Sequence, residues 1–290
     1  MASAPTVVAQ GQQALRQHLL KLERALKADV LAVIGAIVPG AERKVRDALE
    51  KLATRRPRLA VILQTGGGVV EVAERMVNVF RHFYREVVFI VPDVALSAGT
   101  VLVMSGDEIW MDYYSCLGPI DPQIERTMKD GTKRLVPALS YLSQFNRLVE
   151  KSAAGELTTA EMVLLTNFDL AELHAFEEAK EQAVGLIKAW LVQYKFKDWN
   201  ETQTRKAPVS QAQKEAQAEQ IAEKLSAHEH WHSHGRGIPM STLQNELGLR
   251  ITDFGVDPVV RAAIRNYFDL AISYMQVLPL AHLVHGREYL

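Results

Sequence analysis

A run of glycines and a serine stand where two consecutive predicted strands end. The run Thr65 to Gly68 (TGGG) directly follows one apolar segment, and Ser97 follows the next, ahead of the small residues Ala98 and Gly99. Glycines let the backbone approach a ligand closely, and free N–H groups at such a turn can bind a negative charge. A serine with small neighbours at a helix start exposes its hydroxyl, as a nucleophile requires. Together the two features predict a site with an oxyanion turn and an attacking oxygen.

Each half of this pair also has a simpler interpretation. The glycines could form a tight turn that only needs glycine, and Ser97 could be a helix N-cap, for which serine is a leading residue. No Gly-Lys-Ser/Thr of a phosphate loop follows, and contiguous glycines do not match the spaced dinucleotide fingerprint. The pairing of the two features at neighbouring strand ends is what favours chemistry.

Alternating strands and helices are expected to position these residues. Apolar runs predict strands at 30–38, 58–64, 87–91 and 108–111, and helical patterns cover 41–53, 70–84 and 98–104. A helix between two buried strands makes a crossover that keeps the strands parallel. We therefore expect an α/β fold, a layered parallel sheet with flanking helices, in which ligands bind at the carboxyl ends of the strands.

The composition of the 290 residues is that of a globular protein, with 48% hydrophobic and 23% charged residues. The 33 Lys and Arg against 34 Asp and Glu give a net charge of -1, which leaves no basic excess for a phosphate backbone, so we expect no nucleic-acid partner. The single cysteine, Cys116, cannot form an intramolecular disulfide. The apolar stretch Val30 to Pro39 is about half of the roughly 20 residues that a membrane helix needs. We expect a cytoplasmic protein without an integral membrane span.

The order of these features resembles a known family. A strand ending in a polar residue, then Gly-Gly and a helix, then a strand followed by Ser-Ala-Gly and a helix, is similar to the Clp-protease and crotonase-like superfamily. Within it, the chain most resembles the serine dehydrogenase proteinase family, which is related to signal peptide peptidases. The resemblance covers about residues 29–253. It implies a Clp-like fold, a serine endopeptidase that cleaves a peptide or protein substrate through an acyl-enzyme, no cofactor, and a homo-oligomer.

The resemblance also assigns roles to residues of the first half. Ser97 matches the nucleophile, and the backbone N–H groups of Gly68 and Ala98 match the oxyanion hole, with Gly67 shaping the turn.

The chain departs from Clp subunits at the catalytic base. Where those subunits carry histidine, this chain has Asp121, and where they carry the acidic residue it has His234. The resemblance therefore implies a triad in the order Ser97, Asp121, His234. A serine hydroxyl needs a base within hydrogen-bond reach, and a histidine oriented by a carboxylate serves in several chain orders. Asp121 could instead be a turn residue before Pro122.

Other residues compete for these roles. His230 is the second choice for the base. Lys129 and Lys133 could act in a Ser-Lys dyad of the kind that signal peptide peptidases use, but they flank Asp130-Gly131, which predicts an exposed turn. The four histidines between His228 and His234 could bind a metal, yet they lack cysteines and the helical H-E-x-x-H arrangement. We expect surface histidines around one functional member, and no metal.

The rest of the chain is predicted to be mainly helical. We expect four regions: an N-terminal helix in 1–28, the α/β core in 29–134, a helical insert in 135–225, and 226–290, which returns to the core and ends in a helix. Few large apolar residues lie in 211–224, which predicts a solvated helix face or an oligomer contact rather than core. The apolar face of the last helix, 259–275, is a candidate for subunit docking.

Two further functions stay open. The exchanged base position and the helical insert would also suit a catalytically silent scaffold for oligomerisation or partner binding. Crotonase-like chemistry on an acyl-coenzyme A could use the same oxyanion hole. The lack of a basic cluster near the glycine turn and the presence of Ser97 disfavour that last alternative.

Overall fold

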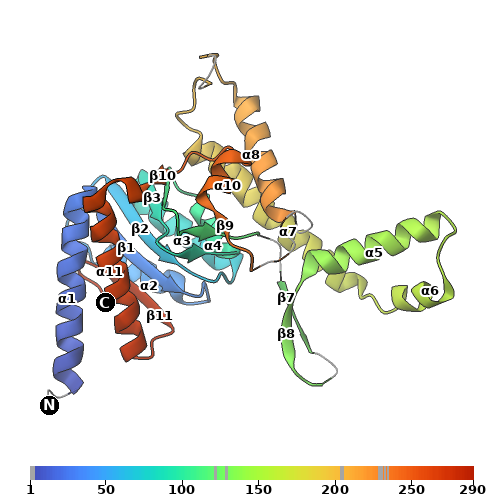
Figure 1. Cartoon of the computed structure of the whole chain (residues 1–290), viewed down its shortest axis with the longest axis horizontal. Helices are drawn as coiled ribbons and strands as arrows, with labels where there is room; N and C mark the ends of the chain where they lie inside the picture. Colours follow the sequence, from blue (N-terminus) through green and yellow to red (C-terminus); the bar gives the residue numbers. More distant parts are fainter. Residues whose placement is uncertain are drawn as a thin grey trace.

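A mostly parallel sheet forms the centre of the protein (Figure 1). The computed structural model describes residues 4–120, 123–127, 130–202, 206–227, 231, 233 and 235–290, and of residues 4–7, 123–127 and 133–140 the backbone alone. The six strands are β1 (Asp29–Gly35), β2 (Arg58–Gln64), β3 (Glu86–Ile90), β5 (Glu108–Met111), β10 (Thr252–Asp253) and β11 (His282–Gly286). They lie in the order β10-β5-β3-β2-β1-β11. All neighbours are parallel except β11, which pairs antiparallel with β1. The expected α/β fold class is confirmed.

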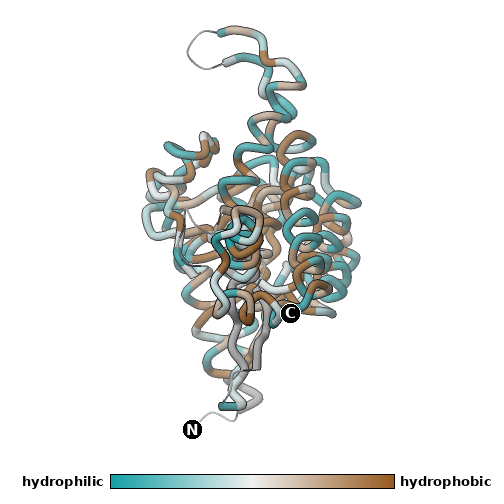
Figure 2. Tube along the Cα trace, turned by 90° about the vertical axis from the view of Figure 1, so that its right-hand side faces the viewer, coloured by the Kyte–Doolittle hydropathy of each residue, from teal (hydrophilic) through white to brown (hydrophobic). Residues whose placement is uncertain are grey.

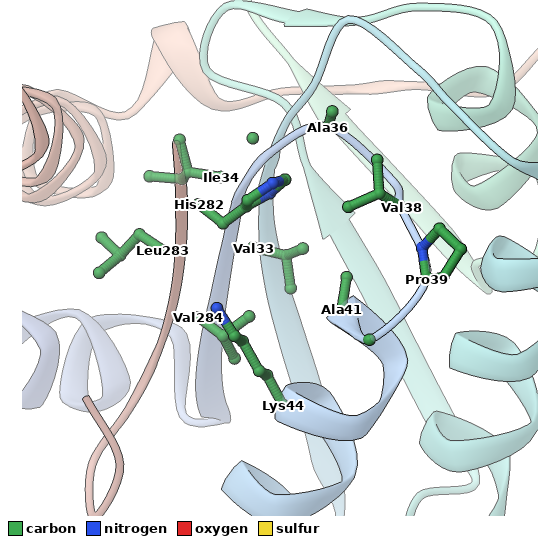
Figure 3. A pocket seen from close by; sticks show the side chains of 12 residues that line it. Val33, Ile34, Ala36, Val38, Pro39, Ala41, Lys44, His282, Leu283 and Val284 are labelled. Atoms are coloured by element: carbon green, nitrogen blue, oxygen red, sulfur yellow. The ribbon is translucent and has the colours of Figure 1, made fainter. Parts of the chain in front are cut away.

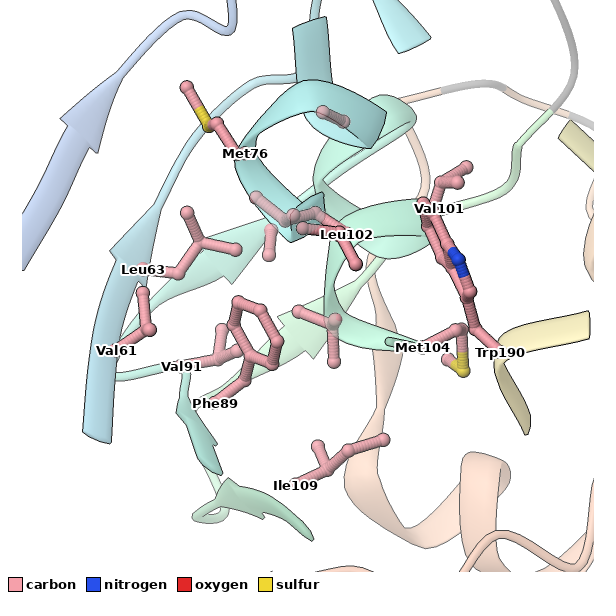
Figure 4. Packing of buried hydrophobic residues seen from close by; sticks show 14 of the residues in the cluster. Val61, Leu63, Met76, Phe89, Val91, Val101, Leu102, Met104, Ile109 and Trp190 are labelled. Carbon is pink, nitrogen blue, oxygen red and sulfur yellow. The ribbon is translucent and has the colours of Figure 1, made fainter. Parts of the chain in front are cut away.

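Helices cover both faces of this sheet, because successive strand residues point to opposite sides. In β2, Ala60 and Ile62 face α1 (Ala4–Leu26) and α11 (Pro258–Val277), which lie side by side in Figure 1. Leu59, Val61 and Leu63 belong to the opposite core, with α2 (Ala41–Glu50), α3 (Val70–Phe83) and α4 (Ala98–Val103). Figure 4 shows α4 packed into this second core through Val101 and Leu102. The helix that follows Ser97 is thus held by apolar contacts all around.

The second core continues into α7 (Leu170–Trp190), the π-helical turn Leu191–Lys195 and α8 (Gln211–Ser226). Trp190 lies beside Met104 at the end of α4 (Figure 4). The prediction that residues 211–224 avoid the core is wrong. One face of α8 is fully buried, through Ala218, Ile221, Ala222 and Leu225. The small alanine side chains let α8 pack closely against α7, so that a face with few large residues still excludes water.

A hairpin and a helical arm extend from the body of the protein (Figure 1). The hairpin consists of β7 (Gln123–Thr127) and β8 (Lys133–Pro137), and Gly131 has the positive φ of its exposed turn. The turn at Asp130-Gly131 is confirmed, whereas the strands were not predicted. The arm comprises α5 (Ala138–Ala153), α6 (Thr159–Leu165) and the start of α7, and encloses a small apolar cluster of its own. Hydrophobic and hydrophilic residues alternate around the helices (Figure 2), as amphipathic elements require.

A second, small sheet joins distant parts of the chain. β4 (Val94–Ala95) pairs parallel with β6 (Cys116–Leu117), and β6 pairs antiparallel with β9 (Ile238–Pro239). After β9 come α10 (Met240–Asn245), β10 and the 3-10 turn Phe254–Val256. The last part of the chain thus returns to both sheets, while the boundaries of the four expected regions stay a prediction.

No helix in the described part of the chain has both the length and the apolar character that crossing a membrane demands. The expected location of the protein stays a prediction.

One histidine is built into the sheet as a neutral core residue. His285 of β11 is only 2% exposed, and its Nδ1 atom shares a hydrogen bond of 2.7 Å with the hydroxyl of Tyr267 in α11. Burial lowers the pKa of His285 to about 4, from an ordinary value of 6.5. Folding therefore excludes a proton that the unfolded chain binds once the pH falls below about 6.5.

This burial predicts a specific loss of stability in mild acid. The pKa of His285 is lower in the folded protein than in the unfolded chain. The neutral ring therefore contributes fully to the free energy of unfolding above about pH 6.5, and this contribution is lost as the pH falls towards about 4. Between pH 7 and pH 5 the free energy of unfolding should fall by about 2 kcal/mol more in the wild type than in His285→Asn. Urea unfolding at both pH values measures this difference. His282→Asn, on the same strand but partly exposed, is the matched control and should behave like the wild type. Equal acid sensitivity in His285→Asn would contradict the assignment.

Candidate active site

The turn after β2 has a backbone that only glycine can adopt. Gly67 and Gly68 have φ values of +106° and +146°. A Cβ atom on Gly68 would lie 2.1 Å from the carbonyl oxygen of Ile37, and one on Gly67 would lie 2.7 Å from Cβ of Ser97. At Gly66, by contrast, a Cβ atom would meet nothing within 4 Å. Gly67 and Gly68 must therefore be glycine, because the turn approaches Ser97 and Ile37 closely, whereas Gly66 need not be.

Two hydrogen bonds fix the orientation of this turn. The N–H of Ile37 donates to the carbonyl of Gly67 at 2.8 Å, and the N–H of Gly67 donates to the hydroxyl oxygen of Thr65 at 3.0 Å. The C=O of Gly67 and the N–H of Gly68 belong to one trans peptide and point in opposite directions. The N–H of Gly68 therefore points away from Ile37. It has no hydrogen-bond partner among the described residues.

Ser97 stands in a sharp turn between β4 and α4. Its backbone has φ 53° and ψ -120°, a conformation that costs a residue with a side chain about 1–3 kcal/mol. Ser97 occupies the N-cap position of α4, but its side chain makes no capping hydrogen bond. The interpretation of Ser97 as a simple helix cap is therefore wrong, because the hydroxyl does not do what a cap does. A strained strand-to-helix turn that exposes a serine is typical of a nucleophile.

Ala98 brings a second unpaired donor beside Ser97. The carbonyl of Ser97 accepts the N–H of Val101 at 3.2 Å, so it points along α4. The N–H of the same peptide, that of Ala98, consequently points out of the helix start. It too lacks a hydrogen-bond partner in the part of the chain that the structure describes. Ser97, which is half-buried, is thus followed directly by one free backbone N–H group and packs against Gly67, the residue before a second one. Backbone N–H donors of this kind can stabilise a developing oxyanion.

The part of the chain that contains this site is similar to a known protein family. Residues 40–162 match the family of ClpP-like SDH-type serine proteinases. The expected resemblance is confirmed over this part of the chain, which contains the glycine turn and Ser97 and ends before the segment with His234.

Two curated relatives come from Methanocaldococcus jannaschii, and both are uncharacterized proteins. One is 27% identical over 118 residues, which are 41% of this chain and 35% of the relative. The other is 34% identical over 74 residues, which are 26% of each protein. The chain therefore matches about a third or less of the length of these relatives.

The similar solved structures include two of one protease. Two structures of a 1510-N membrane-bound stomatin-specific protease, one of them with a substrate peptide, have TM-scores of 0.44 and 0.43 at 12% and 13% identity. They align with 77% of this chain, and the aligned parts are 77% and 73% of those proteins. ClpP1 from Listeria monocytogenes aligns with 33% of this chain and 58% of its own, with a TM-score of 0.29 and 14% identity.

Two buried threonines near the glycine turn and Ser97 have roles that the sequence did not indicate. Thr65 accepts the N–H of Gly67, and Thr100 of α4 accepts the N–H of Gly118 at 2.9 Å. The hydroxyl of Thr100 also lies 2.8 Å from the carbonyl oxygens of Ala95 and Gly118. Thr100 therefore ties the segment after β6 to the helix that follows Ser97. A hydroxyl residue directly before a glycine turn commonly bonds to the backbone of that turn, a signal that could have identified Thr65.

For the remaining candidate residues, the structure describes the flanking chain rather than the side chains. Asp121, His234, His230 and Lys129 lie outside the described residues, and of Lys133, in β8, the backbone alone is described. Their flanks are described: the N–H of Ile120 donates to the carbonyl of Leu225 at 3.0 Å. The residue before Asp121 therefore contacts the end of α8, from which the chain continues towards His234.

Cys116 in β6 is the sole cysteine of the chain and does not offer a second nucleophile near Ser97. Burial raises the pKa of its thiol, and the charge of Asp93 adds to this effect. The thiol stays protonated at neutral pH, and a protonated thiol is a weak nucleophile.

The described residues contain no metal cluster. No group of three or more histidine, cysteine, aspartate or glutamate residues within them is arranged to hold a metal. The histidines of 228–234 lie outside that part, and their lack of a metal stays a prediction. A cavity of about 140 Å³ lies between the end of β1 and the start of β11 (Figure 3). Its walls are mainly apolar, with Lys44 and His282 among them, and neither Ser97 nor Gly68 lines it.

The glycine turn predicts opposite outcomes for two neighbouring substitutions. Gly68→Ala forces a Cβ atom against the carbonyl of Ile37 at an unfavourable φ, so the free energy of unfolding should fall by at least about 2 kcal/mol. Gly66→Ala meets open space and should leave it unchanged or raise it by less than about 1 kcal/mol. Urea unfolding of both variants measures the difference, and equal stabilities would disprove the close approach to Ile37.

Proposed function

We propose that this protein is a serine endopeptidase that hydrolyses peptide bonds through an acyl-enzyme on Ser97. The observation that carries the proposal is the uncapped hydroxyl of Ser97, in a strained turn that packs against Gly67. The match to ClpP-like SDH-type serine proteinases over the same residues supports it.

In the proposed reaction, the base takes the proton of the Ser97 hydroxyl as the oxygen attacks the carbonyl carbon of the scissile peptide bond. The carbonyl oxygen becomes negatively charged, and the N–H groups of Gly68 and Ala98 donate hydrogen bonds to it. Because the sheet fixes these donors in advance, they stabilise the charge without reorganising, and each such donor contributes about 10²–10³ in rate. The amine leaves with a proton from the base, and water then hydrolyses the ester on Ser97.

We assign His234 as the base and Asp121 as the carboxylate that orients it. Support comes from the register of the small sheet, in which Ala95 of β4, Leu117 of β6 and Ile238 of β9 are paired neighbours. β4 and β6 are parallel, and β9 is antiparallel to β6. The ends at which the chain leaves β4 and β6 and the end at which it enters β9 therefore lie along the same edge of the small sheet.

The expected triad members are close in sequence to this edge. Ser97 follows Ala95 by two residues, Asp121 follows Leu117 by four, and His234 precedes Ile238 by four. The strands β4 and β9 lie two strand spacings apart, about 10 Å, and four residues can span up to about 14 Å. A triad is therefore within reach of the chain.

The substrate is proposed to be a peptide or protein, without a cofactor. Homo-oligomerisation, a cytoplasmic location and the absence of a nucleic-acid partner stay predictions.

Ser97→Ala tests the nucleophile. The variant should lose covalent labelling by a fluorophosphonate probe and lower peptide hydrolysis by about 10³-fold or more, because no attacking oxygen remains. Gel fluorescence after labelling and release of fluorescent peptides from a labelled casein measure the two effects. Ser273→Ala, which removes an exposed hydroxyl on α11, is the control and should label like the wild type. A wild type that the probe does not label, with no hydrolysis, would instead favour the catalytically silent scaffold.

Removing the base tests the exchanged triad. His234→Ala and Asp121→Asn should each lower kcat/KM by about 10³-fold or more, while His230→Ala should retain activity within a few-fold. Steady-state kinetics on the labelled casein provide the comparison. Loss of activity in His230→Ala alone would move the role of the base to His230.

A further inference from the structure

Thr65 touches both halves of the candidate site. Its backbone N–H donates to the carbonyl of Val94 and its carbonyl accepts the N–H of Leu96, each at 3.0 Å. These two bonds flank Ala95 and place Thr65 beside the end of β4, just before Ser97. Thr65 has no exposed surface, so water cannot replace its contacts.

The hydroxyl of Thr65 holds the glycine turn. Its oxygen accepts the N–H of Gly67 at 3.0 Å, whereas its distance to the carbonyl oxygen of Gly67 is 3.4 Å, beyond the usual range for a hydroxyl donor. The oxygen is therefore mainly an acceptor. Without it, the N–H of Gly67 would be buried and unpaired, and the turn would have to rotate to find another partner.

The methyl group of Thr65 faces the other half. A Cβ atom on Gly99 would lie 2.4 Å from Cγ2 of Thr65, so the first turn of α4 rests directly on this methyl. Gly99 is two residues after Ser97. One side chain thus contacts the turn that carries the N–H of Gly68 and the helix that carries the N–H of Ala98.

We propose that Thr65 is a positioning residue: its hydroxyl holds the Gly66–Gly67 peptide and thereby helps the bond from Ile37 to direct the next N–H, that of Gly68, towards Ser97. The inference rests on the proposed peptidase function. Thr65 itself does not touch the substrate. It acts through the direction of the Gly68 N–H, which serves the transition state more than the bound substrate.

Two pairs of variants separate the effect of the Thr65 hydroxyl from the effect of its methyl group. Thr65→Val lacks the hydroxyl and retains a branched apolar shape, while Thr65→Ser retains the hydroxyl and lacks the methyl. Should Thr65→Val fail to fold, Thr65→Ala compared with Thr65→Ser isolates the hydroxyl at equal loss of the methyl. Ser105→Ala is the matched control, because it removes a buried hydroxyl that bonds to Leu102 near the other end of α4.

The readouts are the second-order rate constant of fluorophosphonate labelling and the kcat and KM for the labelled casein. Thr65→Val should lower the labelling rate and kcat by at least about 10-fold with KM changed by less than about 2-fold, since only the transition state loses a donor. Thr65→Ser and Ser105→Ala should stay within about 3-fold of the wild type. Melting temperatures confirm that each variant is folded at the assay temperature.

The possible failures are distinguishable. If the wild type labels and Thr65→Val labels at the same rate, the role of Thr65 is disproved and the proposed function stands. If Thr65→Ser is as slow as Thr65→Val, packing rather than the hydroxyl matters, and the inference is again overturned. If neither the wild type nor any variant labels or hydrolyses casein, the proposed function fails and the inference falls with it.

Discussion

The candidate site depends on the plane of one peptide bond, between Gly67 and Gly68. That plane is set by the sheet, because the N–H of Ile37, just beyond β1, holds the carbonyl of Gly67. Paired residues of β1 and β2 differ by 30 in number, as in Ile34 and Gln64, whereas Ile37 pairs with Gly68, a difference of 31. The glycine turn thus contains one residue more than the segment opposite, as a β-bulge does. Because of the extra residue, the N–H of Gly67 has no backbone partner on the neighbouring strand. It donates to the hydroxyl of Thr65 instead.

The strained backbone conformation of Ser97 persists only because the residues around it are rigid. A backbone conformation that costs about 1–3 kcal/mol would relax if its neighbours could move. They cannot, because α4 is buried along its whole length and Thr100 ties its first turn to both Ala95 and Gly118. The apolar core on this face of the sheet therefore offsets the cost of exposing the serine hydroxyl. Stability and the proposed activity are linked through the same helix.

The sequence predicted the framework better than the site. Strands at 58–64 and 108–111 have the predicted bounds, because apolar runs bounded by polar residues have a clear pattern. The strands β4, β6 and β9 have two residues each, too few for any pattern, and yet they carry the chain to and from Ser97. Ile37 could not be identified either, since it acts through backbone atoms that every residue shares. The burial of α8 was misjudged because alanines fill a core only when a neighbouring helix lies close, which the sequence does not disclose.

The small sheet also explains why an exchange of aspartate and histidine, as proposed here, is physically reasonable. A base is useful to a serine because of where it lies, and chain order matters only through the elements that deliver it. β6 and β9 are antiparallel neighbours, so the segment that leaves one and the segment that enters the other meet at the edge beside Ser97. The hydrogen bond between Ile120 and Leu225 joins the same two stretches of chain farther out. Either stretch could supply the imidazole and the other the carboxylate without a change in the sheet. The proposed exchange of Asp121 and His234 relative to Clp subunits therefore requires two different side chains on an unchanged backbone framework.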